Sequence, residues 1–270
     1  PPAVPNPSLF YLLPAARHQA AALVEYIREE SERTRGDGRA ATRVAVLSAD
    51  DEFNREAAEG ARARLEAMRA VAQARPPTLA LAKTYRAGEF AAAALVTELA
   101  KAGAEYVLFF GGPAEFAALA RELERQQVGV RLAGLSLAVG REALGLSPAQ
   151  AARTFLAHPT PLPERADLAE FAALLKREGG GANQLAFRAV AFAAAKVFIE
   201  GVKLSGRRLS RAGLVDSIER LRDFRTGVLP PLTFGPNRRL GVVGAYVVGV
   251  DSANKRLTPL SDLIDVSAER

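Results

Sequence analysis

One short stretch, 106–116 (YVLFFGGPAEF), restricts the possible folds of this chain more than any other. Residues 106–110 are all β-branched, aromatic or Leu, which is typical of a strand buried on both faces of a parallel sheet. The pair Gly111-Gly112 then ends the strand, and Pro113 suits the first turn of a helix, where no N–H is needed. Apolar residues recur at helical spacing before the strand at Phe90, Leu95 and Leu99, and after it at Phe116, Leu119 and Leu123. This pattern predicts a helix, a strand, a glycine turn and a second helix in succession.

The same alternation of short apolar runs and amphipathic segments extends along most of the chain. It predicts strands over 10–13, 44–47, 79–85, 106–110, 128–135, 152–158, 232–234 and 242–250. It predicts helices over 15–30, 54–68, 89–101, 114–126, 167–177, 185–204 and 210–222. A regular strand–helix alternation indicates an α/β fold with doubly wound parallel sheets. Pro159, Pro161 and Pro163 mark a domain boundary, and the glycines at 179–181 predict a flexible joint.

Composition removes several classes of function. The chain has no cysteine, which excludes disulfides, thiol catalysis and cysteine-based zinc sites. Its net charge of +6 is compatible with nucleic-acid binding. However, acidic and basic residues are mixed along 55–66, and we see no interleaving of aromatic and basic residues, so we expect no nucleic-acid partner. The most apolar predicted helix carries charges at Arg188, Lys196, Glu200 and Lys203, which argues against a membrane span.

The candidate binding residues follow from the predicted sheet. In open parallel sheets, ligands bind at the turns that leave the carboxyl ends of the strands. Three such turns supply the candidates Ser48, Phe53, Gly111, Gly112, Pro113, Ser136 and Leu137. Serine hydroxyls and free N–H groups would bind the ligand there, and Phe53 would supply an apolar wall; the alternative is that these are ordinary strand-to-helix turns.

We expect no catalytic residue, metal site or cofactor. The acids at 50–52 could be acid/base groups or metal ligands, but first-turn acids of a helix are commoner. Gly111-Gly112 lacks the dinucleotide-binding spacing, and neither a phosphate-binding loop nor a nucleophile elbow occurs. The two histidines, His18 and His158, are expected at the surface or in a hinge.

An ordered set of segments carries a resemblance to a known family. They are 9–14 with Gln19 and Leu23, then 44–53, 85–90, 192–206 and 232–241. Together they resemble the type I periplasmic solute-binding proteins of ABC importers, in the branched-chain amino-acid branch. The resemblance implies a bilobed clamshell that holds a small solute in the cleft between its lobes. It also implies a periplasmic or otherwise extracytoplasmic location and the membrane subunits of an ABC importer as partners. The alternative is a ligand-sensing domain or an enzyme on a similar α/β scaffold.

The resemblance also assigns the lobes. Residues 1–158, completed by 241–270, would form the second lobe, and 159–240 would be the remaining part of a first lobe that lacks its first part. Apolar surface over 167–232 would then be exposed, which implies self-association or a missing N-terminal half-lobe.

The helix 185–204 is expected to pack Val190, Val197 and Phe198 against a sheet, so that Phe198→Ala would cost about 3 to 5 kcal/mol.

The resemblance finally bears on the solute. In amino-acid-binding relatives an acid meets the ligand's ammonium group, and Ser136 stands at the matching place here. Pro113 stands where an aromatic residue is usual. Because a hydroxyl does not compensate a buried ammonium, we expect a solute without a free ammonium group, such as a carboxylate or a neutral organic molecule.

Overall fold

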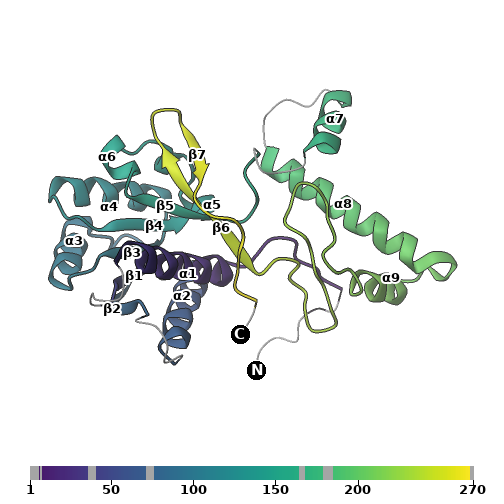
Figure 1. Ribbon diagram of the computed structural model, residues 1–270, viewed down its shortest axis with the longest axis horizontal. Helices are drawn as coiled ribbons and strands as arrows, with labels where there is room; N and C mark the ends of the chain where they lie inside the picture. Colours follow the sequence, from purple (N-terminus) through teal and green to yellow (C-terminus); the bar gives the residue numbers. More distant parts are fainter. Residues whose placement is uncertain are drawn as a thin grey trace. The chain divides into compact units, whose positions relative to one another are not determined.

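The computed structural model describes residues 6, 8–35, 41–70, 76–163, 168–178 and 185–267. The chain divides into two compact units (Figure 1). Unit 1 comprises Pro1–Ala15 and Pro159–Val243, and unit 2 comprises Ala16–His158 and Gly244–Arg270. The expected boundaries therefore need correction, because residues 1–15 and 241–243 group with 159–240 and not with the rest of 1–158 and 241–270. The assignment of the units to two lobes of a clamshell stays a prediction.

Unit 2 is built on one sheet with the strand order β2-β1-β3-β4-β5-β6-β7, in which β8 also pairs with β6. The strands are β1 (Arg43–Ala49), β2 (Thr78–Tyr85), β3 (Tyr106–Phe110), β4 (Arg131–Leu135), β5 (Thr154–His158), β6 (Gly244–Asp251), β7 (Arg256–Pro259) and β8 (Ile264–Asp265). The first five strands are parallel, and β6 joins β5 in the antiparallel direction. This confirms the predicted α/β class with a doubly wound parallel sheet.

Helices cover both faces of this sheet, which explains its apolar strands. They are α1 (Ala16–Arg35), α2 (Glu52–Ala70), α3 (Ala92–Lys101), α4 (Pro113–Arg125), α5 (Ser136–Leu144) and α6 (Pro148–Ala151). Figure 1 shows α1 and α2 on one face and α4 on the other, and the contacts of α1 with α2 and of α3 and α5 with α4 agree with this division. All five residues of β3 are buried, and α4 begins at Pro113, both as predicted.

Several local predictions in the chain need correction. The helix expected over 89–101 begins only at Ala92, and the turn expected at Ser136 is already the first residue of α5. The predicted strands 10–13 and 232–234 reduce to isolated bridges, Tyr11 with Leu240 and Phe224 with Leu232. In these two segments the apolar residues have no continuous neighbouring strand to pair with, so they do not form strands of a sheet. The glycines 179–181 lie outside the described residues.

Unit 1 is mainly helical where the structure describes it. Its elements are α7 (Ala169–Arg177), α8 (Leu185–Ser205), the 3₁₀ turn η2 (Gly206–Arg208) and α9 (Arg211–Ile218). Ser210 caps α9 as predicted, since its Oγ accepts a hydrogen bond from the N–H of Gly213 at 3.0 Å. Gly201 permits α8 to approach α9 closely, because a Cβ there would lie 2.8 Å from the side chain of Ile218.

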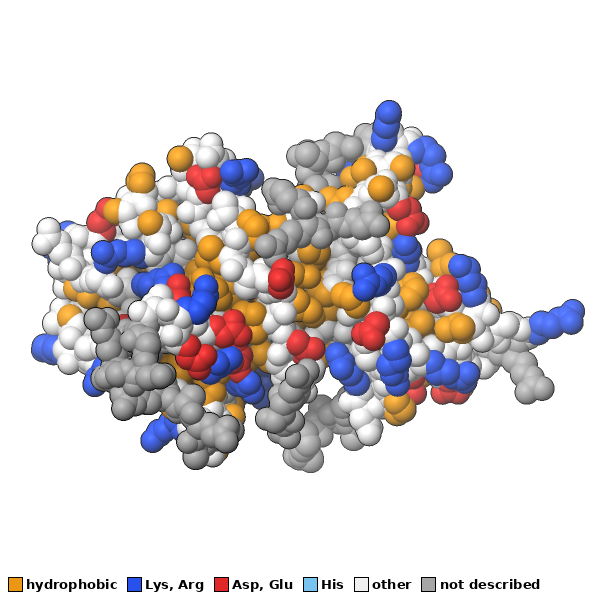
Figure 2. Space-filling model, viewed as in Figure 1, with side chains coloured by type: hydrophobic (Ala, Val, Ile, Leu, Met, Phe, Trp, Pro, Cys, Tyr) orange, Lys and Arg blue, Asp and Glu red, His pale blue; other side chains and the backbone are white. Residues whose placement is uncertain are grey.

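The predicted burial of Phe198 was wrong. Its side chain is 55% exposed, whereas the adjacent Val197 is 5% exposed. Helical periodicity requires one buried face, and in α8 that face includes Ala193, Val197 and Gly201, of which Gly201 lies against α9. No strand of a sheet lies among the described residues of unit 1 to cover the opposite face. On the face drawn in Figure 2, apolar and basic side chains are intermixed over the region of α8 and α9.

The neighbours Val197 and Phe198 form a matched pair for a stability measurement. We expect Val197→Ala to lower the free energy of unfolding by about 1 to 2 kcal/mol, because it removes buried methyl groups. Phe198→Ala should change it by less than about 0.5 kcal/mol, as is usual for an exposed position. Urea unfolding followed by circular dichroism measures both. A cost of Phe198→Ala as large as that of Val197→Ala would show that a partner covers this face in solution.

Candidate ligand-binding edge of the sheet

The carboxyl ends of β1 to β5 meet at one edge of the sheet in unit 2. The order β2-β1-β3-β4-β5 changes direction between β1 and β3, which makes this pair the topological switch point where doubly wound sheets bind ligands. Ser48 lies near the end of β1 and pairs in register with Phe110, the last residue of β3. Gly111 follows β3 and Ser136 follows β4, so the structure brings these three predicted residues to one edge.

Ser48 and Phe53 differ in their exposure to solvent. Ser48 is 2% exposed, and its Oγ lies 3.2 Å from Oγ1 of Thr84 on β2, so its hydroxyl already has a partner. Phe53, in the first turn of α2, is 47% exposed and presents an apolar surface. Leu137 in the first turn of α5 is 60% exposed, and Pro113 is exposed as well. The exposed apolar groups at this edge therefore include Phe53 and Leu137.

The glycine turn after β3 is shaped by a tyrosine that the sequence analysis did not single out. Tyr85, the last residue of β2, is buried and donates its hydroxyl to Oε2 of Glu115 at 2.7 Å. The backbone N–H of Gly112 donates to the same oxygen at 3.0 Å. Burial raises the pKa of Tyr85, and the hydrogen bond to Glu115 raises it further, so the phenol stays protonated. Gly112 has thus already used its N–H, and Pro113 has none, which leaves fewer donors for a ligand at this helix start than expected.

Gly111 is required by the close approach of this tyrosine. A Cβ at Gly111 would clash with the hydroxyl of Tyr85 and would lie 2.7 Å from Cζ of Phe109. At Gly112 the nearest atom would be Oε2 of Glu115 at 3.4 Å, an ordinary contact. The two glycines therefore have different roles. Gly111 leaves space for the hydroxyl of Tyr85 and the ring of Phe109, while Gly112 caps α4.

Ser136 and His158 form a hydrogen-bonded pair at the ends of two adjacent parallel strands. Oγ of Ser136 lies 2.8 Å from Nδ1 of His158, and Ser136 is 7% exposed. Burial lowers the pKa of His158 to about 4, so the imidazole is neutral at neutral pH. A serine within reach of a histidine is also the arrangement of a nucleophile and its base. A base with a pKa this low is poorly matched to proton transfer near pH 7.

The acids after β1 stabilise the start of α2. Oδ1 of Asp51 accepts the N–H of Asn54 at 3.0 Å, and Asp50 pairs with Arg55 at 3.2 Å. The described residues contain no group of three histidines or acids that could hold a metal ion. None of the helices in the described part of the chain is long and apolar enough to cross a membrane.

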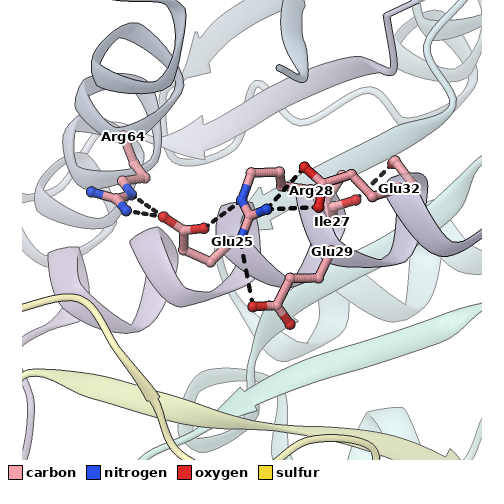
Figure 3. A network of polar contacts seen from close by, with 7 residues as sticks. Glu25, Ile27, Arg28, Glu29, Glu32 and Arg64 are labelled. Carbon is pink, nitrogen blue, oxygen red and sulfur yellow. Dashed lines mark hydrogen bonds and ion pairs between the residues drawn. The ribbon is translucent and has the colours of Figure 1, made fainter. Parts of the chain in front are cut away.

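A network of charged side chains joins α1 to α2 (Figure 3). Glu25 is 6% exposed and lies between two arginines: it accepts Nε of Arg28 at 2.9 Å, and it accepts a bond from Arg64 of α2. Arg28 also pairs with Glu32 at 2.8 Å. The mixed charges along 55–66 are typical of a solvated helix face, on which Arg64 would be exposed. Instead it compensates a buried carboxylate, a role that requires the tertiary contact between the two helices.

This chain is similar to known proteins in both sequence and structure. A family model described as "Periplasmic binding protein" matches residues 1–255. Among solved structures, a branched-chain amino acid ABC transporter protein from Thermus thermophilus with bound valine matches with a TM-score of 0.71 at 17% identity, over 96% of this chain and 67% of that one. A type 1 periplasmic binding protein from Bordetella pertussis matches with a TM-score of 0.68 at 22% identity, over 94% and 68%.

A third similar structure is a fatty acid ABC transporter substrate-binding protein from Thermomonospora curvata, with a TM-score of 0.70 at 14% identity, over 97% of this chain and 67% of that one. A comparison with curated proteins finds no match. At these identities the structural likeness shows the fold, and the chain spans about two thirds of each of the three solved chains. With the family match over most of its length, the chain belongs to the periplasmic binding protein family and has the type I fold of that family.

Proposed function

We propose that this chain is an extracytoplasmic solute-binding protein that holds a small organic molecule at the carboxyl edge of the sheet in unit 2. The observation that carries this proposal is that Ser48 and Gly111 lie at the topological switch point and Ser136 lies at the end of the next strand, in a chain of this family. Phe53 and Leu137 would contribute apolar contact beside them. The membrane subunits of an ABC importer would receive the solute, as the names of the Thermus and Thermomonospora relatives suggest.

The solute that we propose has no free ammonium group. Ser136, at the end of β4, is engaged with a neutral imidazole and carries no charge. The carboxylate of Glu115 already accepts two hydrogen bonds, and those of Asp50 and Asp51 have partners in α2. A buried ammonium without a dedicated carboxylate is costly, whereas a carboxylate or a neutral polar molecule needs no carboxylate partner. We therefore favour a small carboxylic acid or a neutral organic solute over an α-amino acid.

Calorimetric titration tests both parts of this proposal. We expect binding of a member of a panel of short aliphatic and aromatic carboxylic acids, and no heat with valine, leucine or isoleucine. Phe53→Ala should weaken the binding about tenfold or more, because the loss of an apolar contact from a large side chain costs at least about 1.4 kcal/mol.

Phe187→Ala is the matched control, because Phe187 is exposed and lies on α8 in unit 1. This variant should bind like the unchanged protein. Tight binding of valine would contradict the preference for a solute without ammonium. Equal affinities of the Phe53→Ala variant and the unchanged protein would contradict the proposed edge.

A further inference from the structure

The net positive charge of this chain is concentrated in unit 1. By sequence, unit 1 has 14 basic and 8 acidic residues, so its net charge of +6 equals that of the whole chain. Unit 2 is therefore neutral overall. Because an excess of one sign of charge attracts partners of the opposite sign, an anionic partner would bind to unit 1 in preference to unit 2.

This charge is densest in the connection from α8 to α9, residues 203–211 (KLSGRRLSR), which we call the basic turn. It has four basic residues and no acidic one by sequence. The side chains of Lys203, Arg207 and Arg211 are exposed. Nζ of Lys203 lies 3.5 Å from Glu200, whereas Arg207 and Arg211 have no acidic partner among the described residues. Figure 2 shows basic side chains projecting at this end of the α8–α9 hairpin.

The basic turn also exposes two leucines. Leu204 is 50% exposed and Leu209 is 56% exposed. Polar contacts hold the turn in place, because Oγ of Ser205 at the end of α8 lies 3.0 Å from Oγ of Ser217 in α9. Gly206 supplies the left-handed backbone conformation, with a φ of 57°, in which the chain reverses. The turn therefore presents apolar and basic groups together on a fixed backbone.

Arg211 stands at a position that is unfavourable for a cation. It is the first residue of α9, and the first turn of this helix contains no acid. The partial positive charge at the start of a helix favours an acid there and disfavours a base. A negatively charged surface in contact with the turn would compensate both charges. A residue that opposes a local preference in this way is expected mainly at functional sites.

We propose that the basic turn binds the surface of a bilayer that contains anionic phospholipid. Lys203, Arg207 and Arg211 contact the lipid phosphates, while Leu204 and Leu209 enter the boundary between headgroups and acyl chains. The leucines favour a bilayer over an acidic protein or a soluble polyanion, because a polyanion offers no apolar layer. The proposal concerns unit 1 and does not depend on the solute proposed for unit 2.

Sedimentation of the full chain with vesicles tests this proposal. We expect binding to vesicles of phosphatidylcholine and phosphatidylglycerol in equal parts, with half of the chain bound at a lipid concentration on the order of 1 mM. Vesicles of phosphatidylcholine alone should bind at least tenfold more weakly. Raising the sodium chloride concentration from about 0.05 to about 0.5 M should also weaken binding at least tenfold, because salt screens exposed charges.

Two sets of substitutions separate the roles of charge and apolar contact. The triple variant Lys203→Gln, Arg207→Gln, Arg211→Gln should bind the mixed vesicles at least tenfold more weakly, because each basic group near an anionic bilayer strengthens binding roughly fivefold. The double variant Leu204→Ser, Leu209→Ser keeps every charge and should bind at least fivefold more weakly. Both variants should keep the melting temperature of the unchanged protein, because the substituted side chains are exposed.

A matched charge variant controls for the net charge of the chain. Arg69, Lys101 and Arg121 are exposed on α2, α3 and α4 of unit 2. Their joint substitution by Gln removes as much charge as the triple variant in the basic turn, but it should leave vesicle binding within about twofold of the unchanged protein.

A fluorescent label reports directly on contact with the bilayer. The chain has no cysteine, so Leu209→Cys provides a single site for an environment-sensitive nitrobenzoxadiazole label. Its emission should shift to shorter wavelength and gain intensity with the mixed vesicles. The same label on Arg121→Cys should not respond.

Three results would overturn the proposal. The first is the absence of binding to the mixed vesicles at low salt. The second is an equal loss of binding in the two triple variants, which would mean that net charge alone is responsible. The third is unchanged binding by the double leucine variant together with a silent label at 209, which would mean that the turn accepts any polyanion. Solute titrations report on Phe53 and the strand ends, so failure of either proposal is recognisable by itself.

Discussion

Lowering the pH from about 7 to about 4 is expected to reduce the free energy of unfolding by up to about 3 kcal/mol through His158 alone. Burial lowers the pKa of His158 from 6.5 to about 4 in the folded chain, whereas the unfolded chain keeps the ordinary value. Between these two pH values the unfolded state binds a proton that the folded state does not. The stabilisation is therefore complete above about pH 6.5 and is lost progressively as the pH falls toward 4.

Urea unfolding across this pH range measures the effect, and the histidine variants identify its source. His158→Gln should remove most of the loss between about pH 6.5 and pH 4. His18→Gln is the comparison, since burial and the neighbouring Arg17 also lower the pKa of His18. A loss of stability that persists in His158→Gln and disappears in His18→Gln would refute the assignment to His158.

Gly111→Ala is expected to destabilise the chain by about 1 to 3 kcal/mol, the usual cost of overpacking a well-packed site. The new methyl group would occupy space taken by the Tyr85 hydroxyl and the Phe109 ring. Gly112→Ala is the matched control: its methyl group meets no atom closer than 3.4 Å, so the cost should stay below about 1 kcal/mol. Urea unfolding of both variants, followed by circular dichroism, measures the difference.

A double-mutant cycle attributes this cost to the tyrosine. Tyr85→Phe removes the hydroxyl that stands against Gly111 and also breaks its bond to Glu115. Gly111→Ala should therefore cost less in the Tyr85→Phe background than in the unchanged chain. Equal costs in both backgrounds would mean that the hydroxyl is not the obstacle and that the ring of Phe109 alone opposes the methyl group.

The parts of the fold that could be predicted are those fixed by neighbouring residues. The structure contains the buried strand β3, the glycine turn after it and the start of α4 at Pro113 as expected. Each of these features depends only on residues that are adjacent in the sequence. Phe198 shows where this reasoning ends. Its spacing places it on an apolar stripe of α8, but spacing does not tell which of two apolar stripes another element covers. The segment 10–13 is similar, because strand propensity forms no strand without a neighbour to pair with.

The candidate site likewise has parts that could be predicted from the sequence and parts that could not. Ser48, Gly111 and Ser136 could be placed at strand ends from the sequence, and the structure gathers them at one edge. Their partners Thr84, Tyr85 and His158 belong to other strands, and strand order depends on contacts distant in sequence. His158 was nevertheless accessible to sequence reasoning. It ends a predicted strand, as the residue before Ser136 does, and adjacent parallel strands place such ends side by side.

The antiparallel strand β6 has a consequence for how unit 2 is protected from aggregation. β5 is the last of the parallel strands, and its apolar Phe155 and Leu156 would lie along an open edge if the chain stopped after the first part of this unit. An open apolar edge offers unpaired N–H and C=O groups to other chains. The chain returns to the sheet at Gly244, where β6 pairs with β5 and covers that edge. On its other side β6 pairs with β7. Because β5 is synthesised before β6, the N–H and C=O groups along this edge of β5 stay unpaired until β6 has been made and pairs with it.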